Sequence, residues 1–111
     1  MIGADAIRGH ITLMVLAILE HQPSYAYEIS RTITEISGGT YAMKQTTLYT
    51  AVKRLESLGY LDSYDATSDS GKSRTYYRLT GPGRAHLDEK RAEWQQTRDL
   101  VDHFVKGDGR P

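Results

Sequence analysis

The stretch that decides the fold is Thr46-Thr47-Leu48-Tyr49-Thr50-Ala51-Val52-Lys53-Arg54-Leu55-Glu56-Ser57-Leu58-Gly59-Tyr60-Leu61. Apolar side chains recur in it at helical spacing, which predicts a helix over residues 45–58. Gly59 is expected to end this helix, because glycine readily adopts the left-handed backbone conformation that a helix end requires. The other side of the helix is polar and basic. The predicted buried face consists of Leu48, Val52, Leu55 and Leu58.

A second basic element follows in Lys72-Ser73-Arg74-Thr75-Tyr76-Tyr77-Arg78. Its alternation predicts a hairpin with strands at residues 60–65 and 74–79, around a tip rich in serine, aspartate and glycine. Tyr77 and Leu79 are expected to point into the core. A half-buried helix followed by a basic hairpin is typical of a winged helix-turn-helix. Double-stranded DNA is therefore the first candidate partner.

The rest of the chain completes a fold that is mainly α-helical with a small β-hairpin. Apolar spacing predicts a first helix over residues 5–21. Ser24 is expected to act as N-cap of a second helix over residues 25–36. Thr80 is expected to cap a last helix that runs to about Val105.

The last helix is longer than the compact head can cover, since more than 20 helical residues span roughly 30 Å. A second copy of the chain is the simplest partner for its apolar stripe, so we predict a two-fold homodimer. The expected interface residues are Leu87, Trp94, Val101, Phe104 and Val105. The predicted parts are a DNA-binding domain over 1–80 (its helix 5–21 also contributing to the dimer), a dimerisation helix over 81–106 and a frayed tail over 107–111.

Composition limits the possible functions. The formal net charge is zero, which argues weakly against DNA binding, but residues 72–84 carry four basic side chains and no acidic one. With no cysteine there is neither a disulfide nor a thiolate metal site. No apolar run approaches the ~20 residues of a membrane span, and no signal peptide is recognisable. We expect a cytoplasmic protein.

Catalytic and metal sites find little support in the sequence. The four histidines are scattered without ligand spacing, and there is no nucleophile motif or phosphate-binding glycine loop. We expect a protein that is not an enzyme and needs no cofactor or metal.

Three motifs occur in order along the chain: Ala26-Tyr27-Glu28-Ile29, then Thr47 to Glu56 followed by Gly59, then Arg74 to Gly83. In this combination the chain resembles the PadR family of bacterial transcriptional regulators. It departs from the family pattern with Ala26 for glycine, Thr50 for proline and Val52 for leucine. The Thr50 change bears on which bases the helix reads.

The N-terminal part of a recognition helix reaches base edges, while flanking groups hold phosphates. We assign Gln45, Thr46, Thr50 and Lys53 as candidate base readers. The candidate phosphate contacts are Tyr27, Lys44, Thr47 and Tyr49, and the candidate wing contacts are Lys72, Ser73 and Arg74. Arg54 is expected either to pair with Glu56 or to contact DNA.

The short C-terminal part resembles the small PadR subgroup, which includes multidrug-sensing repressors. In those sensors a tryptophan fourteen residues after the wing threonine stacks a flat ligand, and Trp94 stands fourteen residues after Thr80. The resemblance implies repression and a planar aromatic effector. The alternative is that Trp94 only anchors the dimer. The candidate effector residues, meeting across the dimer, are Leu13, Ala17, Leu87, Arg91, Trp94 and Arg98.

The leading interpretation is a dimeric, ligand-responsive repressor that binds a pseudo-palindromic operator. One rival is a winged-helix protein–protein adaptor, since a fold does not fix a function. An adaptor is expected to carry apolar or acidic residues on the recognition helix, whereas this chain has threonine, glutamine, tyrosine and lysine. A second rival is a binder of duplex DNA without sequence preference.

Overall fold

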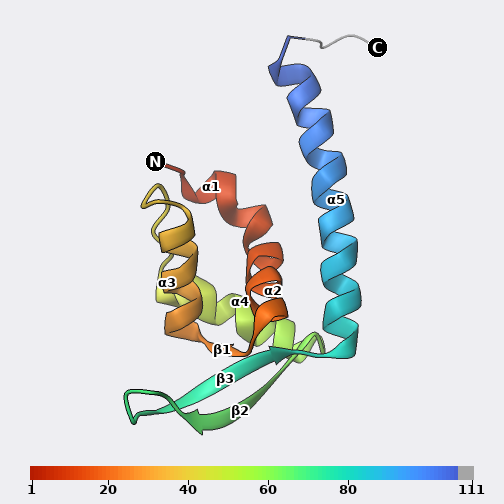
Figure 1. Ribbon diagram of the computed structural model, residues 1–111. Coiled ribbons are helices and arrows are strands. Elements are labelled where there is room, and N and C mark those ends of the chain that lie inside the picture. Colours follow the sequence, from red (N-terminus) through yellow and green to blue (C-terminus); the bar gives the residue numbers. More distant parts are fainter. Residues whose placement is uncertain (108–111) are drawn as a thin grey trace.

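The computed structural model describes residues 1–107 and shows a helical head, a small sheet and one long helix that stands beside the head (Figure 1). Its shape is elongated, 56 × 31 × 20 Å. The elements in chain order are α1 (Ala4–Ile7), η1 (Arg8–His10), α2 (Ile11–His21), β1 (Ser24–Tyr25), α3 (Ala26–Ile36), α4 (Gln45–Ser57), β2 (Leu61–Thr67), β3 (Ser73–Leu79) and α5 (Gly81–Val105). This arrangement is a winged helix-turn-helix, as the sequence predicted. Residues 108–111 of the expected tail lie outside the described residues.

The predicted first helix is not continuous. The chain forms α1, then a tight 3-10 turn over Arg8–His10, and only then α2. Gly9 in this turn has a low helix propensity and presents no side chain to pack. The prediction of a single helix was therefore wrong at its N-terminal end, although α2 is helical as predicted and buries Val15, Leu16 and Leu19.

The sheet has a third strand that the sequence analysis missed. Ser24 and Tyr25 form β1 and pair antiparallel with Tyr77 and Tyr76, giving the strand order β1-β3-β2. The prediction that Ser24 caps α3 was therefore wrong, because Ser24 is buried in the sheet and Tyr25 occupies the N-cap position without a side-chain bond. A strand of two residues is too short to show alternation.

Helix α4 agrees closely with the prediction. Leu48 and Val52 are fully buried, and Gly59 has a φ of +83° just past the helix end. The Tyr60 amide donates to the Leu55 carbonyl at 3.0 Å across this turn, as helix ends with a left-handed glycine commonly do. Leu58 was wrongly placed on the buried face; it is the C-cap residue and its side chain is 55% exposed.

Helix α5 begins as predicted at Thr80, whose hydroxyl accepts a hydrogen bond from the Gly83 amide at 3.0 Å. Its first half packs against α2, Trp94 just past its middle contacts His10, and the end of the helix extends beyond the head (Figure 1). In the described part of the chain no helix combines the length and apolar character that a membrane crossing requires.

Candidate nucleic-acid interface

The polar side of α4 is open to solvent. Gln45, Thr46, Tyr49, Thr50 and Lys53 are all exposed on it. The Thr50 hydroxyl donates to the Thr46 carbonyl at 2.9 Å, so the two threonines form one local unit. The residues predicted to read bases thus share a continuous surface, while Thr47 lies half-buried at its edge.

Lys53 keeps its charge on this surface. Its Nζ lies 3.6 Å from a Glu56 carboxylate oxygen and 5.4 Å from the centroid of the Tyr49 ring. The pKa of Lys53 is raised, first by the nearby Tyr77 phenol and then by Tyr49 and Glu56. The ammonium therefore stays protonated at neutral pH and is held beside Tyr49.

Gln45 is tied to α3. Its side-chain amide donates to the hydroxyl of Ser30, a buried residue whose own hydroxyl donates to the Tyr27 carbonyl at 2.9 Å. This chain of bonds fixes the start of α4 against the start of α3. It also uses one of the amide donors that the sequence analysis assigned to a base edge.

A hollow of about 270 Å³ brings together residues from α3, α4 and β3. Side chains from three separate predicted groups meet in it, because the start of α3 and strand β3 both flank α4. Those predicted residues are Tyr27, Gln45, Tyr49, Lys53 and Arg74. Lys44, Lys72 and Ser73 are exposed outside it.

Arg74 does not project from the wing tip with Lys72 and Ser73. Its guanidinium lies 5.2 Å from the centroid of the Tyr25 ring, and its Nε is buried without a hydrogen-bond partner in the described residues. Tyr25 in turn packs edge-to-face on Tyr76 at 5.4 Å. This supporting role of Tyr25 was not predicted from the sequence, because it depends on strand β1, which the sequence pattern does not reveal.

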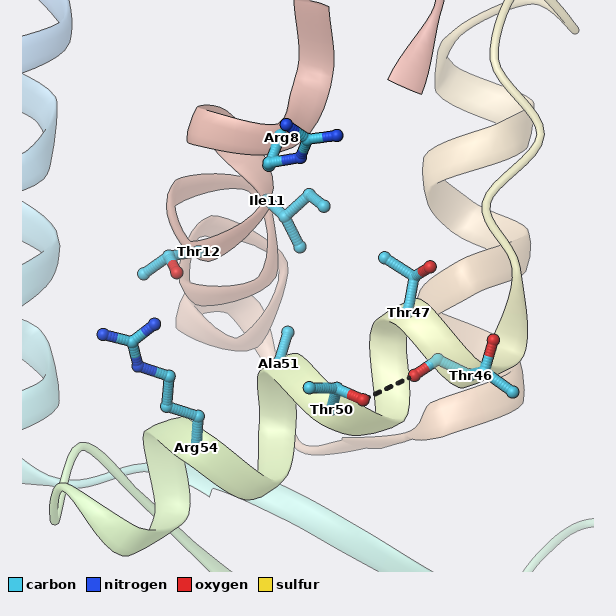
Figure 2. A pocket seen from close by; sticks show the side chains of 8 residues that line it. All are labelled: Arg8, Ile11, Thr12, Thr46, Thr47, Thr50, Ala51 and Arg54. Atoms are coloured by element: carbon cyan, nitrogen blue, oxygen red, sulfur yellow. Dashed lines mark hydrogen bonds between the residues drawn. The ribbon is translucent and has the colours of Figure 1, made fainter. Parts of the chain in front are cut away.

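Arg54 does not pair with Glu56. The Glu56 carboxylate accepts from the Ser63 hydroxyl and lies near Lys53, whereas Arg54 points toward Thr12 of α2 (Figure 2). Arg54 forms no ion pair with any residue that the structure describes. This arginine was left undecided by the sequence, because only the packing of α4 on α2 sets its direction.

The apolar stripe of α5 is divided into a covered and an uncovered part. Leu87 is only 1% exposed and belongs to the core of its own chain, so almost none of its surface is left for a dimer interface or an effector. The Trp94 ring lies 5.0 Å from the His10 ring, edge to face. Beyond it, the apolar side chains are exposed because α5 has passed the end of the head. The exposed apolar residues are Leu100, Val101, Phe104 and Val105.

Within residues 1–107, the other candidate effector residues are divided among different surroundings. Arg98 donates to Gln95 on its own helix at 2.6 Å, and Leu13 packs against the core. Ala17 lines an apolar groove of about 370 Å³ on the α3 side of α2. The groove is lined by Ile2, Ile7, Met14, Ala17, Ile18, His21, Ile33, Ile36, Ser37 and Tyr41.

Arg91 links α5 to α2 through a two-pronged ion pair with Glu20, at 2.9 and 2.5 Å. The hydrogen bonds from Arg91 lower the pKa of the Glu20 carboxyl from its ordinary value of 4.5. The folded state thus favours the charged form, so the pair stabilises the fold above pH 4.5 and loses this effect as the pH falls through the lowered folded-state value.

We expect Glu20→Gln to lower the midpoint of thermal unfolding at pH 7, because the carboxylate that Arg91 binds is removed. The difference from the unchanged protein should shrink below about pH 4, where carboxyl groups become protonated. Thermal unfolding between pH 3 and 7 measures this. Glu93→Gln, which removes a carboxylate paired with Lys90 inside α5, is the control. A difference that stayed constant with pH would contradict the expectation.

Comparison with known proteins gives a consistent result. The model of the "Transcriptional regulator PadR-like family" matches residues 15–89. A transcriptional regulator from Clostridium thermocellum superposes with a TM-score of 0.85 at 39% identity, covering 95% of this chain and 99% of the other. A PadR family transcription regulator from Clostridium difficile superposes with a TM-score of 0.76 at 33% identity, covering 87% and 99%. Bacillus subtilis PadR in complex with operator DNA shares the fold, with a TM-score of 0.63 at 20% identity over 71% of this chain and 45% of the other.

Proposed function

The chain belongs to the PadR-like family of transcriptional regulators, and from this premise we propose that it is a dimeric repressor that binds a specific DNA operator. The observation that carries the proposal is the exposed polar side of α4, flanked by the hollow that joins Tyr27, Tyr49, Lys53 and Arg74. These side chains offer hydroxyl, ammonium and guanidinium donors, which suit base edges and phosphates. The B. subtilis PadR structure with operator DNA supports the same use of the fold.

Helix α4 would enter the major groove, with its first residues against base edges and the β2–β3 hairpin beside the flanking backbone. In a two-fold dimer, two such helices would enter successive major grooves about 34 Å apart, so the operator should be a pseudo-palindrome with half-sites one helical turn apart. The adaptor alternative is disfavoured because the exposed side of α4 carries no acidic residue and no aliphatic one.

Two uncovered apolar surfaces support the dimer. One is the end of α5 with Val101 and Phe104, and the other is the groove between α1, α2 and α3, where Ile36 is 78% exposed. Both belong to every copy, so a two-fold axis can bury both at once in a self-complementary interface. Contiguous apolar surface of this kind commonly marks an interaction site.

The test is selection of duplexes from a random pool, followed by fluorescence anisotropy of the selected site and a scrambled duplex at two salt concentrations. A reporter promoter that carries the site should lose expression when the protein is present. Enrichment of a pseudo-palindrome with salt-sensitive binding is expected. Failure to enrich any sequence, with equal binding to both duplexes, would favour the non-specific binder, and no binding at all would favour the adaptor.

Lys53→Gln should relax the preference at one base-pair position in each half-site, because a lysine contact to guanine discriminates by about 1–3 kcal/mol. Anisotropy against single-substituted operators measures it. Lys90→Gln on α5 removes the same charge beside an acidic partner, Glu93, and serves as the control. If Lys53→Gln weakened all sequences equally, Lys53 would be a phosphate contact and not a base reader.

We further propose that a planar aromatic ligand shifts the DNA-binding equilibrium from a site near Trp94. The support is the half-buried position of Trp94 beside His10, at the point where α5 leaves the head. A ligand seated there would alter the tilt of α5 against α2 and so the spacing of the two heads. Titration of Trp94 fluorescence with aromatic acids, flavins and planar dyes tests this, and an unchanged signal throughout would leave Trp94 as a dimer anchor.

A further inference from the structure

A second hollow lies on the other side of α4, between this helix and the η1–α2 segment (Figure 2). Its volume is about 460 Å³. Arg54 reaches in from α4 toward Thr12, and Arg8 lies across the opposite end (Figure 2). Thr46 and Thr50 belong both to this hollow and to the exposed side of α4. The full lining is Arg8, Ile11, Thr12, Thr46, Thr47, Thr50, Ala51 and Arg54.

The hollow is positively charged, and several of its hydrogen-bond donors have no partner among the described residues. None of its eight lining residues is acidic, and Arg54 has no ion-pair partner within residues 1–107. The ion pair of Arg8 with Asp5, at 2.7 Å, joins side chains that are 74% and 91% exposed, so it holds Arg8 weakly. The hydroxyls of Thr12 and Thr47 make no hydrogen bond with another described residue.

We propose that this hollow binds a phosphate of the DNA backbone, with Arg54 as the principal contact and Arg8 and the threonine hydroxyls as further donors. A guanidinium fork matches the geometry of a phosphate, and hydroxyls beside it supply the remaining bonds. The inference rests on the proposed DNA-binding function. It adds a residue pair, Arg8 and Arg54, that lies apart from the Lys53 and Arg74 side of α4.

The position favours a backbone phosphate over a small free anion. The hollow is open and continuous with the surface expected to face DNA, since Thr46 and Thr50 line both. Lys53 and Arg74 flank α4 on one side and Arg8 and Arg54 on the other. A helix in the major groove runs between two sugar–phosphate strands, so cations on both flanks would hold both strands and fix how the helix enters.

The first measurement is the salt dependence of DNA binding by Arg54→Gln. Each lost phosphate contact should make the log–log slope shallower by about 0.9, and hence by about 1.8 for a dimer with two hollows. Affinity for the selected operator and for the scrambled duplex should fall by a similar factor, roughly tenfold or more, because phosphate contacts carry no base preference. Arg8→Gln, which leaves α4 unchanged, should produce a smaller change in the same direction, and Arg54→Lys should restore part of the slope.

Lys106→Gln is the matched control, since Lys106 is also exposed, forms no ion pair with a described residue and lies at the far end of α5. An equal loss of slope in Lys106→Gln and Arg54→Gln would show only a general charge effect and would overturn the proposal. An unchanged slope in Arg54→Gln, in a wild-type protein that binds its operator, would overturn it while leaving the proposed function intact. Absence of any DNA binding by the wild type would instead remove the function on which it rests.

A further arm distinguishes a free anion. Inorganic phosphate is titrated against the DNA-free protein while thermal unfolding is followed. If phosphate raised the unfolding midpoint of the wild type but not of Arg54→Gln, and the DNA salt slope were the same in both, the hollow would hold a free oxyanion and the backbone-phosphate proposal would be wrong. The expected outcome has two parts. Arg54→Gln makes the salt dependence of DNA binding shallower, and free phosphate changes the unfolding midpoints of the wild type and of Arg54→Gln equally.

Discussion

Replacing Gly83 with alanine is expected to destabilise the protein by about 3 kcal/mol, at the upper end of what overpacking usually costs. A Cβ at this position would lie 2.0 Å from the backbone oxygen of Tyr60 and 3.1 Å from Cδ2 of Leu79. The Tyr60 oxygen cannot rotate away, because it belongs to the main chain and accepts a hydrogen bond from the Thr80 amide at 3.1 Å. The first turn of α5 would therefore have to move away from the head.

Thermal and urea unfolding measure this effect, and the chain supplies its own control. Gly81 is two residues earlier in the same turn, and a Cβ built there meets nothing within 4 Å. Gly81→Ala should therefore unfold close to the wild type. Equal midpoints for Gly83→Ala and Gly81→Ala would show that α5 is not held against Tyr60 in this way. A partial loss of the Glu20–Arg91 link is also expected in Gly83→Ala, because that ion pair depends on where α5 stands.

Local signals in the sequence were sufficient for α4, the wing and the start of α5. Leu48, Val52 and Leu55 repeat at helical spacing within the thirteen residues of α4, Gly59 follows the helix end, and Thr80 caps α5. Each of these features is decided by neighbours a few residues away in the chain. Such features are readable without knowledge of the tertiary structure.

Features that depend on contacts between residues far apart in the chain could not be predicted from the sequence. Strand β1 forms by pairing with the edge of β3, which is distant in sequence. Arg74 likewise lies against the ring of Tyr25, which belongs to β1. Leu87 and Val101 look alike in the sequence, yet one lies against the head and the other beyond it. Nothing in the neighbouring sequence marks Gly83 as special, whereas its close approach to the Tyr60 backbone makes glycine necessary there. The direction of Arg54 was likewise set by the packing of α4 on α2.

Introducing aspartate at Val101 and Phe104 together is expected to convert the proposed dimer to monomers and to weaken operator binding by roughly 10²–10⁴-fold. The two side chains are 52% and 59% exposed in the single chain. They continue the stripe that Leu87 begins, past the point where α2 covers α5. In a two-fold interface each change acts twice, and burial of each apolar side chain contributes about 1.5–3 kcal/mol. Aspartate would also bring an unpaired charge into the interface.

The expected loss of DNA affinity arises because the two DNA-binding heads are no longer joined. The exposed side of α4, which is expected to contact the bases, is unchanged in this variant. Once one head of a dimer is bound, the second head meets its half-site at high effective concentration, and a monomer has no such advantage. Sedimentation gives the oligomeric state, and anisotropy against full and half operators gives the affinity. The double variant should bind the full operator no better than the half-site, whereas Ala92→Asp, an exposed position on the opposite face of α5, should stay dimeric. A double variant that remained dimeric and bound the full operator normally would show that the end of α5 lies outside the interface, and would leave the groove beside α3 to a different occupant.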